Sequence, residues 1–532
     1  MKTKNILSVL AVSALVFTGC VDLDTIPEGN IVTSDQKDEI LESDPSKAEA
    51  SVNAIYTQFS LFATVITETE RHNDIGYPAL MLFMDTNGAD FLSDDNGYNW
   101  MGNSLTFDDR IFTSYESRIN WGVLYNQIYA ANTVISFLGE DSENPDYQNY
   151  VAQAHAARAF DYWVLAQLYQ FNYTNHKSDP CVPIITEKNA LTVTDEGCPR
   201  ATVEQVYAQM MEDINKAISV LEDSPLKRRD KRYISVDVAY GIRARINLSM
   251  GNWAAAAEDA DKAISLSSSS PYTIEQMKRP AFNSADDNSW MWGIKIAETD
   301  EVVTTGICNF PSHMGSFNYG YCWYSGGRQI NKMLFESIPA TDVRKGWWLD
   351  ENTQSPNLNE DDMEVINTYY GPYTQVKYAP YKGELWTSTN ASDIPLMRIE
   401  EMYLIKAEGQ AMSGNVAGAK TTLESFIQEY RDPEFTCKAT SPQDMQEEIY
   451  HQRRIELWGE GMSWFDIMRL NKGVDRRGAG YPNASSIFNI QPGDPILLWR
   501  LPEKEIQANK ALSNNDNNKA TPIPSPVPDF GE

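Results

Sequence analysis

The chain has 532 residues and is strongly acidic: 44 Lys and Arg residues stand against 74 Asp and Glu residues, a formal net charge of −30 at pH 7. Such a charge repels phosphate backbones, which argues against nucleic acid as a partner. The length and a hydrophobic content of 42% are enough for a large buried core.

The N-terminus has the pattern of an export signal. An apolar run over 6–16 follows two early lysines and is shorter than the roughly 20 residues of a membrane-spanning helix. The run ends at Cys20 and resembles a bacterial lipobox, in which the cysteine is acylated after cleavage. We therefore expect 1–19 to be a signal peptide and a lipid on Cys20 to be the membrane anchor. Phe17 stands where Leu is usual, so a plain secretory signal with an incidental cysteine is the alternative.

The segment 20–46 is polar and acidic, and it predicts a tether between the anchor and the folded body. Asp22 and Asp24 follow the cysteine closely, a partial match to the acidic residues that mark lipoproteins for the outer face of the outer membrane. No later apolar run reaches the roughly 20 residues of a membrane span.

Helical spacing dominates the rest of the chain. The run 202–221 begins with Thr202 and has Gln205 three residues later, which predicts a capping box. A second long helix is predicted within 151–173. The segments 239–264 and 400–427 share one plan, in which two Ala-bearing helices flank a Gly-Asn turn, as in tetratricopeptide repeats.

Cysteines and acidic turns give no strong sign of a metal or cofactor, and we expect neither. Cys20 aside, five cysteines remain, so a pair such as Cys181 with Cys198 is conceivable but not established by spacing. The acidic turns 94–97 and 360–362 do not match a calcium loop, and solvated turns are the preferred interpretation. The other cysteines are Cys308, Cys322 and Cys437.

Five ordered segments resemble the SusD/RagB family of Bacteroidetes outer-membrane lipoproteins. The segment 393–419 is similar to the family's D-x-P-x-x-R-x-A-E pattern, with Glu400 and Gly409 where Ala is usual. The segment 447–473 is similar to its E-R-x-x-E-L-x-x-E-G-x-R-x-x-D pattern, with Ser463 where Arg is common. The other matching segments are 157–186, 199–214 and 498–517.

This resemblance implies a mainly α fold, in which tetratricopeptide-like helix pairs form a scaffold decorated by long irregular loops and a few short strands. We expect an N-terminal part over 47–300 and a C-terminal part over 301–532, together forming one unit. The resemblance also implies a partner, a TonB-dependent transporter of the SusC class, and a non-catalytic role in capturing glycans at the cell surface.

Two loops carry the residues expected to contact a glycan, since sugars need flat aromatic rings and hydrogen-bonding groups. They are 84–103 and 316–328. In the second, aromatics alternate, so a short strand with one aromatic face against the helices is the alternative. Trp347, Trp348 and Trp386 are weaker candidates. The predicted ligand contacts are Asp90, Asn96, Tyr98, Trp100, Tyr319, Tyr321, Trp323 and Tyr324.

Two other functions compete with glycan capture. An oligopeptide is the alternative ligand within the same family. A glycoside hydrolase would need two carboxylates, and Glu456 with Glu460 is one pair to consider. Helical spacing instead favours ion pairing on this segment, such as Arg453 with Glu456 and Asp466 with Arg469.

Overall fold

The computed structural model describes residues 46–62, 72–94 and 96–531. It is mainly helical, with 52% helix and 5% strand, as the sequence predicts. The predicted signal peptide, Cys20 and the tether up to residue 45 lie outside the described residues. Residues 48–532 form one compact unit.

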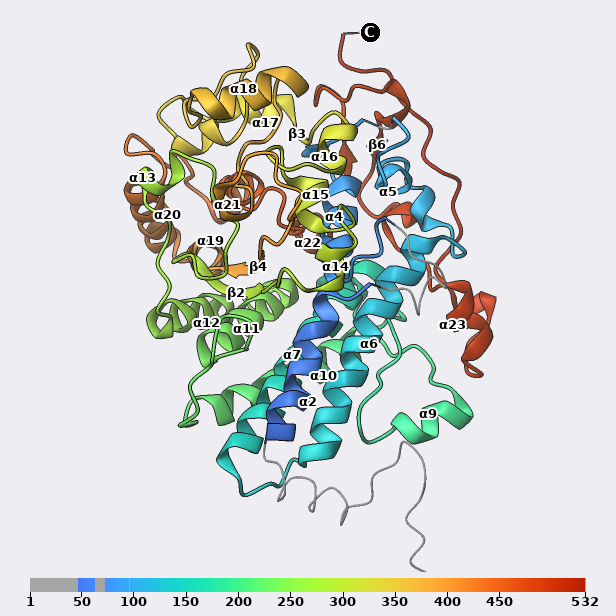
Figure 1. Ribbon diagram of the computed structural model, residues 1–532. Coiled ribbons are helices and arrows are strands. Elements are labelled where there is room, and N and C mark those ends of the chain that lie inside the picture. Colours follow the sequence, from blue (N-terminus) through green and yellow to red (C-terminus); the bar gives the residue numbers. More distant parts are fainter. Residues whose placement is uncertain (1–45, 63–71, 95, 532) are drawn as a thin grey trace, which may run out of the picture. The chain divides into compact units, whose positions relative to one another are not determined.

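A series of long helices forms the scaffold (Figure 1). Helix α6 packs on α7, α7 on α10, α11 on α12, α12 on α19, and α19 on both α20 and α21. These helices are α6 (Tyr115–Leu138), α7 (Pro145–Tyr169), α10 (Val203–Leu221), α11 (Val236–Met250), α12 (Trp253–Leu266), α19 (Ile399–Met412), α20 (Val416–Tyr430) and α21 (Pro442–Glu456).

Shorter elements decorate this scaffold. The strands form three two-stranded antiparallel sheets, β1 with β3, β2 with β4, and β5 with β6. The strands are β1 (Phe91–Leu92), β2 (Trp290–Ile294), β3 (Gln329–Ile330), β4 (Ile394–Arg398), β5 (Val474–Asp475) and β6 (Asn489–Ile490). The short helices are α2 (Ser46–Thr57), α4 (Tyr77–Asn87), α5 (Gly102–Thr106), α8 (Tyr173–His176), α9 (Ala190–Glu196), α13 (Ile274–Met277), α14 (Glu301–Thr304), α15 (Phe310–Met314), α16 (Tyr321–Tyr324), α17 (Lys332–Ser337), α18 (Glu360–Tyr369), α22 (Ser463–Arg469) and α23 (Glu503–Ala508).

The local signals in the sequence are confirmed. The Thr202 hydroxyl accepts from the Gln205 amide at 3.2 Å, and the Gln205 side chain accepts from the Thr202 amide at 2.9 Å. Both predicted Gly-Asn turns join helices, and their glycines, Gly251 and Gly414, have φ of 74° and 96°. Only glycine adopts that left-handed conformation without strain.

The two similar helix pairs pack against each other although they are far apart in the sequence. Helix α12 of the first pair lies on α19 of the second. A Cβ atom on Gly409 would lie 2.5 Å from the Trp253 carbonyl oxygen and 2.9 Å from the Ala257 Cβ. The close contact of α12 and α19 therefore explains why Gly409 departs from the usual Ala.

A group of buried charges joins the C-terminal elements, and we call it the buried charge network. Its bases and acids are equal in number, so the charges balance. Arg398 on β4 bonds Glu460 at 2.8 and 2.9 Å and Glu456 at 3.0 Å. Its members are Arg344, Lys377, Arg398, Arg431, Asp342, Glu400, Glu456 and Glu460.

Glu456 is the centre of this network. Its carboxylate bonds Arg431 at 2.7 and 2.8 Å, and it also contacts Arg398 and Arg344. Burial alone would raise the pKa of Glu456, but the three guanidinium groups, Arg431 foremost, hold it well below its usual range. Glu400, which replaces the usual Ala, accepts from Arg431 at 3.0 Å.

One of the two predicted helix-surface ion pairs is wrong and the other is confirmed. Arg453 does not pair with Glu456; it bonds Asp466 at 2.7 Å, because the three other arginines occupy the Glu456 carboxylate. Asp466 and Arg469 pair at 2.8 Å as their spacing predicts. Both pairs are buried, so they are part of the core and do not lie on a solvated face.

The conceivable disulfide between Cys181 and Cys198 does not form, since both are free thiols. Burial raises the pKa of the Cys181 thiol to about 12. Cys322 and Cys437 are also free and buried.

The network gives the first testable prediction. Replacing Glu456 with Gln leaves three buried guanidinium groups short of counter-charge, so we expect a loss of about 3–5 kcal/mol in the free energy of unfolding. Urea denaturation measures this loss. The control is Glu298→Gln, which breaks an exposed pair with Lys382 and should leave the midpoint unchanged. Equal midpoints for the wild type and Glu456→Gln would contradict the role assigned to the network.

A second prediction concerns Asp161 on α7. Both of its carboxyl oxygens are buried without a hydrogen-bond partner among the described residues, and burial raises its pKa well above the ordinary value. The folded protein thus favours the protonated form, and wild-type stability falls as the pH rises above the unfolded-state pKa of about 3.9. An Asn side chain at position 161 would be uncharged at every pH and would therefore not contribute this pH dependence.

We therefore expect Asp161→Asn to be more stable than the wild type at pH 7, by more than about 1 kcal/mol, and to show little gain at pH 3. Urea midpoints at the two pH values measure this. Asp195→Asn, at an exposed position, is the control. A gain that is the same at both pH values, or a loss at pH 7, would show that Asp161 is ionised in the folded protein.

Candidate functional site

The two loops expected to contact ligand come together in the structure. Strand β1, which lies within the first loop, pairs with β3, which directly follows the second loop, with Phe91 opposite Ile330. Farther along, the Asn96 side-chain amide donates to the Tyr324 carbonyl oxygen at 2.5 Å. The Arg328 guanidinium donates to the Ser93 hydroxyl and to the His313 carbonyl oxygen. Loops more than 200 residues apart therefore form one site.

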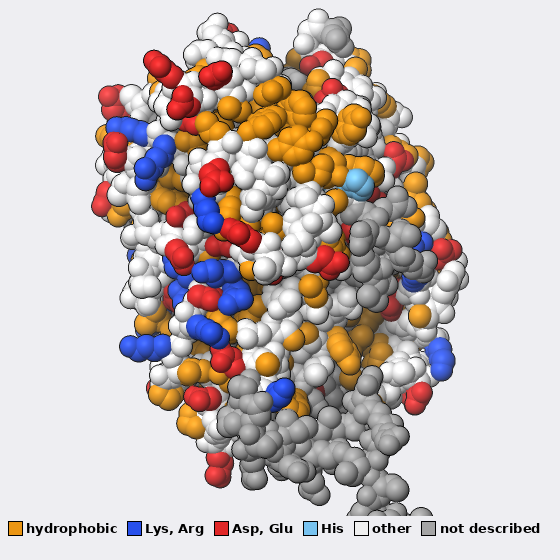
Figure 2. Space-filling view, in the orientation of Figure 1, with side chains coloured by type: hydrophobic (Ala, Val, Ile, Leu, Met, Phe, Trp, Pro, Cys, Tyr) orange, Lys and Arg blue, Asp and Glu red, His pale blue; other side chains and the backbone are white. Residues whose placement is uncertain are grey.

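Aromatic rings from these loops form a continuous group at the molecular surface. The Tyr98 ring lies 5.2 Å from Tyr324, and the Tyr324 ring lies 4.4 Å from Trp323. The hydroxyls of Tyr319 and Tyr324 are 3.1 Å apart. Figure 2 shows hydrophobic side chains gathered on this face around α16, β3 and α17. The group, which we call the aromatic surface, is Tyr98, Tyr319, Trp323, Tyr324, Tyr369 and Trp386.

Two members of the aromatic surface come from outside the two predicted loops. Tyr369 and Trp386 stack on each other with ring centroids 4.7 Å apart, and Trp323 lies within 5.4 Å of both. Trp386 has a φ of 60°, which is rare for a bulky side chain. Its amide donates to the Phe317 carbonyl oxygen at 2.7 Å, and this bond helps to hold the strained backbone next to the second loop.

The second loop contains a short helix and not the strand considered as the alternative. Helix α16 spans four residues, with Tyr321 and Cys322 buried and Trp323 and Tyr324 half-buried. The Tyr321 amide donates to the Ser312 hydroxyl on α15 at 3.0 Å. A Cβ on Gly320 would lie 2.2 Å from that hydroxyl, so glycine allows the close contact that positions α16.

Asp90 and Tyr321 do not lie on the aromatic surface, contrary to expectation. Asp90 is 8% exposed, and its carboxylate bonds the Arg454 guanidinium at 2.5 and 2.7 Å. Tyr321 is 4% exposed and stacks on His313 with centroids 4.7 Å apart. Each side chain points into the protein and supports the loop that carries it.

Trp100 lies at the edge of the site. It is half-buried and stacks on His72, with centroids 4.1 Å apart and ring planes 13° apart. Between Asn96 and Trp100, Tyr98 is 54% exposed and is the most accessible ring of the aromatic surface. Asn99 is buried and bonds the Asp94 carbonyl oxygen at 2.8 Å, which closes the loop on itself. The other predicted contacts, Asn96, Tyr98, Tyr319, Trp323 and Tyr324, do come together.

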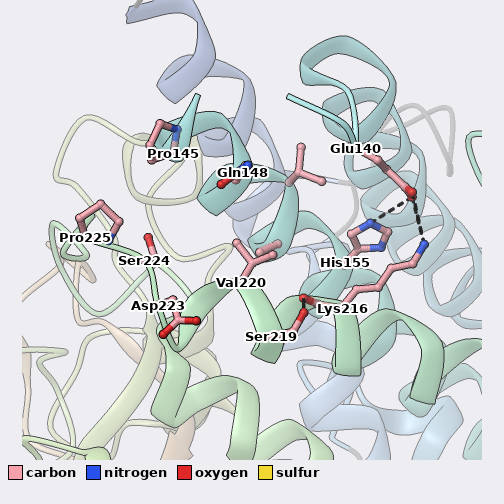
Figure 3. Close-up of a pocket in the computed structure, with 12 residues that line it drawn as sticks. Glu140, Pro145, Gln148, His155, Lys216, Ser219, Val220, Asp223, Ser224 and Pro225 are labelled. Atoms are coloured by element: carbon pink, nitrogen blue, oxygen red, sulfur yellow. Dashed lines mark hydrogen bonds and ion pairs between the residues drawn. The ribbon is translucent and has the colours of Figure 1, made fainter. Parts of the chain in front are cut away.

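A separate hollow lies between α7 and α10. It has a volume of about 480 Å³, and Glu140, His155 and Lys216 point toward one another on its wall (Figure 3). Glu140 lies 3.2 Å from Lys216 and 3.4 Å from His155, so its carboxylate already has partners within the wall. The described residues of its wall include no Trp or Tyr, the side chains whose rings best match the apolar face of a sugar.

The acidic turn 360–362 has a structural role. These residues are the first turn of α18, where negative charge is favourable, and Asp362 forms a capping box with Asn359. Among the residues that the structure describes, no group of three or more His, Cys, Asp and Glu side chains is arranged to hold a metal ion.

The fold and the aromatic surface define a class, that of helical scaffolds with a surface group of aromatic rings built from loops. Two family models match the chain: one described as "Starch-binding associating with outer membrane" over residues 39–248, and one described as "SusD family" over residues 318–518. The chain belongs to the SusD/RagB family. Among the described residues, no helix is both long and apolar enough to cross a membrane.

Curated relatives share this assignment. The chain is 24% identical over 410 residues to the SusD-like protein P38 of Formosa agariphila. This alignment covers 68% of this chain and 73% of the relative. It is 22% identical over 545 residues to the SusD-like protein P25 of the same organism. This alignment covers 90% of this chain and 95% of the relative.

Solved structures share the fold. A SusD-like carbohydrate binding protein from Bacteroides vulgatus aligns with a TM-score of 0.74 and 23% identity, over 90% of this chain and 98% of that chain. The surface glycan-binding protein A from Bacteroides thetaiotaomicron, solved with laminarihexaose, aligns with a TM-score of 0.64 and 16% identity, over 88% of this chain and 99% of that chain.

Proposed function

We propose that this protein is a non-catalytic lipoprotein that captures oligosaccharides at the cell surface on its aromatic surface. It then delivers them to a TonB-dependent transporter of the SusC class. The aromatic surface carries the proposal, because a group of partly exposed Trp and Tyr rings matches the apolar face of a sugar.

The polar groups beside the rings suit the hydroxyl rim of a sugar. Tyr319 and Tyr324 bring two hydroxyls within 3.1 Å of each other, and each hydroxyl both donates and accepts. Asn96 is exposed at the same edge. Because Tyr and Trp side chains lose little conformational freedom on binding, a group of them binds efficiently for its area.

A hydrolytic role for Glu456 and Glu460 conflicts with their surroundings. Glu456 is fully buried among three arginines, and Glu460 bonds Arg398 and Lys377 at 2.8 and 2.7 Å. Burial alone would raise the pKa of Glu460, but Arg398 and Lys377 outweigh it and lower that pKa, so neither carboxyl is poised to act as an acid. An oligopeptide ligand remains the alternative within the family.

The membrane anchor and the transporter belong to the same proposal. The lipobox-like segment ending at Cys20 supports lipidation, and the family description associates its members with the outer membrane. A lipid anchor would restrict the protein to the membrane plane, where it meets its transporter by lateral diffusion. The two acids after Cys20 support placement on the outer face.

Two assays on one polysaccharide panel separate the competing functions. We expect the protein to be retarded in native gels that contain its glycan and to release no reducing ends from it. Release that disappears when a single carboxylate is replaced would make the protein an enzyme. Binding only to peptide mixtures would select the oligopeptide alternative.

Substitutions on the aromatic surface test the location of binding. We expect Trp323→Ala to weaken glycan affinity by tenfold or more, about 1.4 kcal/mol, because a half-buried ring at the centre of the group is lost. Tyr369→Ala should weaken it less. Tyr129→Ala removes a ring that is 71% exposed on α6, away from the site, and is the matched control.

Isothermal titration measures these affinities, and circular dichroism checks that each variant is folded. If Trp323→Ala and Tyr129→Ala bind equally well, the ligand does not lie on the aromatic surface.

A further inference from the structure

A polar cavity lies beside the aromatic surface, and the same loop contributes to both. Within the loop, Tyr98 belongs to the aromatic surface, while Gly97, Asn99 and Trp100 line the cavity. The cavity has a volume of about 360 Å³, within the usual range of about 300–1,000 Å³ for small-molecule sites. The rest of its wall comes from Asn73, Gly102, Asn103, Thr106, Asp108, Tyr115 and Glu116.

Glu116, in the first turn of α6, contributes a buried carboxyl group to this wall. It is 4% exposed, and its Oε1 accepts from the side-chain amides of Asn103 at 3.0 Å and Asn73 at 3.4 Å. Its Oε2 is buried and has no hydrogen-bond partner among the described residues, and the same holds for the Trp100 Nε1. Burial also raises the pKa of Glu116.

The unused groups are complementary to a hydroxyl. A sugar hydroxyl donates one hydrogen bond and accepts others, so a carboxyl oxygen and an indole N–H are each suitable partners for it. The Trp100 ring adds a flat apolar face to the same wall. A sugar unit that continues from Tyr98 would reach this cavity next.

The charge of the cavity determines which sugars fit. Among the described lining residues, the carboxylic acids are Glu116 and Asp108, the latter held by the Thr106 hydroxyl at 2.9 Å, and there is no Lys or Arg. A uronate or sulfate group placed there would lie near two carboxyl groups, and the described lining residues offer no base to pair with it. The Arg118 guanidinium lies outside this lining, over the Tyr115 ring at 5.5 Å from its centroid. The chain's net charge of −30 acts in the same direction.

We propose that this cavity is a subsite for a sugar unit without an acidic group, and that it restricts the protein to uncharged glycans. The inference rests on the proposed function, since it assumes that a glycan occupies the aromatic surface. The cavity would select the class of glycan that binds, which the aromatic rings alone do not determine.

The test compares uncharged and acidic glycans with the full-length protein. Laminarin and starch are the uncharged probes, and alginate and polygalacturonate are the acidic ones. We expect the wild type to bind an uncharged glycan and neither acidic one. Tight binding of an acidic glycan by the wild type would overturn the proposal.

Two variants locate the effect. Thr106→Phe fills the cavity and leaves every ring of the aromatic surface in place. We expect it to lower affinity for long uncharged oligosaccharides roughly tenfold and to leave the shortest bound oligosaccharides unaffected. Asp108→Lys places a base at the cavity, and we expect it to introduce measurable binding of polygalacturonate.

Asp146→Lys makes the same charge change at an exposed position on α7 and is the matched control. If it increases polygalacturonate binding as much as Asp108→Lys does, the effect is one of net charge and the subsite is refuted. If Trp323→Ala abolishes binding while Thr106→Phe and Asp108→Lys behave as the wild type, the subsite fails and the proposed function stands. If the wild type binds no glycan at all, the proposed function itself fails.

Discussion

The buried charge network is the interaction on which the rest of the C-terminal structure depends. Buried charged groups are stable only when each has oppositely charged partners at close range. The network therefore requires β4, α19, α21 and the turn after α21 to meet in one arrangement. Two of the segments that match the family patterns, 393–419 and 447–473, supply half of these charges, namely Arg398, Glu400, Glu456 and Glu460. These four charged side chains hold the scaffold together, and none of them belongs to the aromatic surface.

The network also positions both halves of the site. On one side, Lys377 bonds Glu460 at 2.7 Å, and two residues earlier the Gln375 amide donates to the Arg328 carbonyl oxygen at 2.8 Å, just after α16. On the other side, the Trp458 indole donates to the Asp90 carbonyl oxygen at 2.7 Å, at the start of β1. Asp90, expected to contact ligand, instead anchors the loop that carries Tyr98.

The sequence predicted what depends on local chemistry. Helical periodicity located the scaffold, the Thr202 cap and the two Gly-Asn turns, and composition identified two loops that do meet. It did not separate Tyr319 from Tyr321, because only the packing of α16 on α15 decides which ring is buried. Tyr369 and Trp386 were missed as a pair, since their contact depends on long-range folding. The doublet Tyr369-Tyr370 shows the difficulty: the first is 40% exposed and the second 6%.

The most direct test of the account is a crystal structure of the protein with an oligosaccharide that it retains in gels. We expect sugar rings to lie against the aromatic surface, with Trp323 and Trp386 in contact with the ligand and the α7–α10 hollow empty. A ligand bound in that hollow, with the aromatic surface unoccupied, would contradict the account.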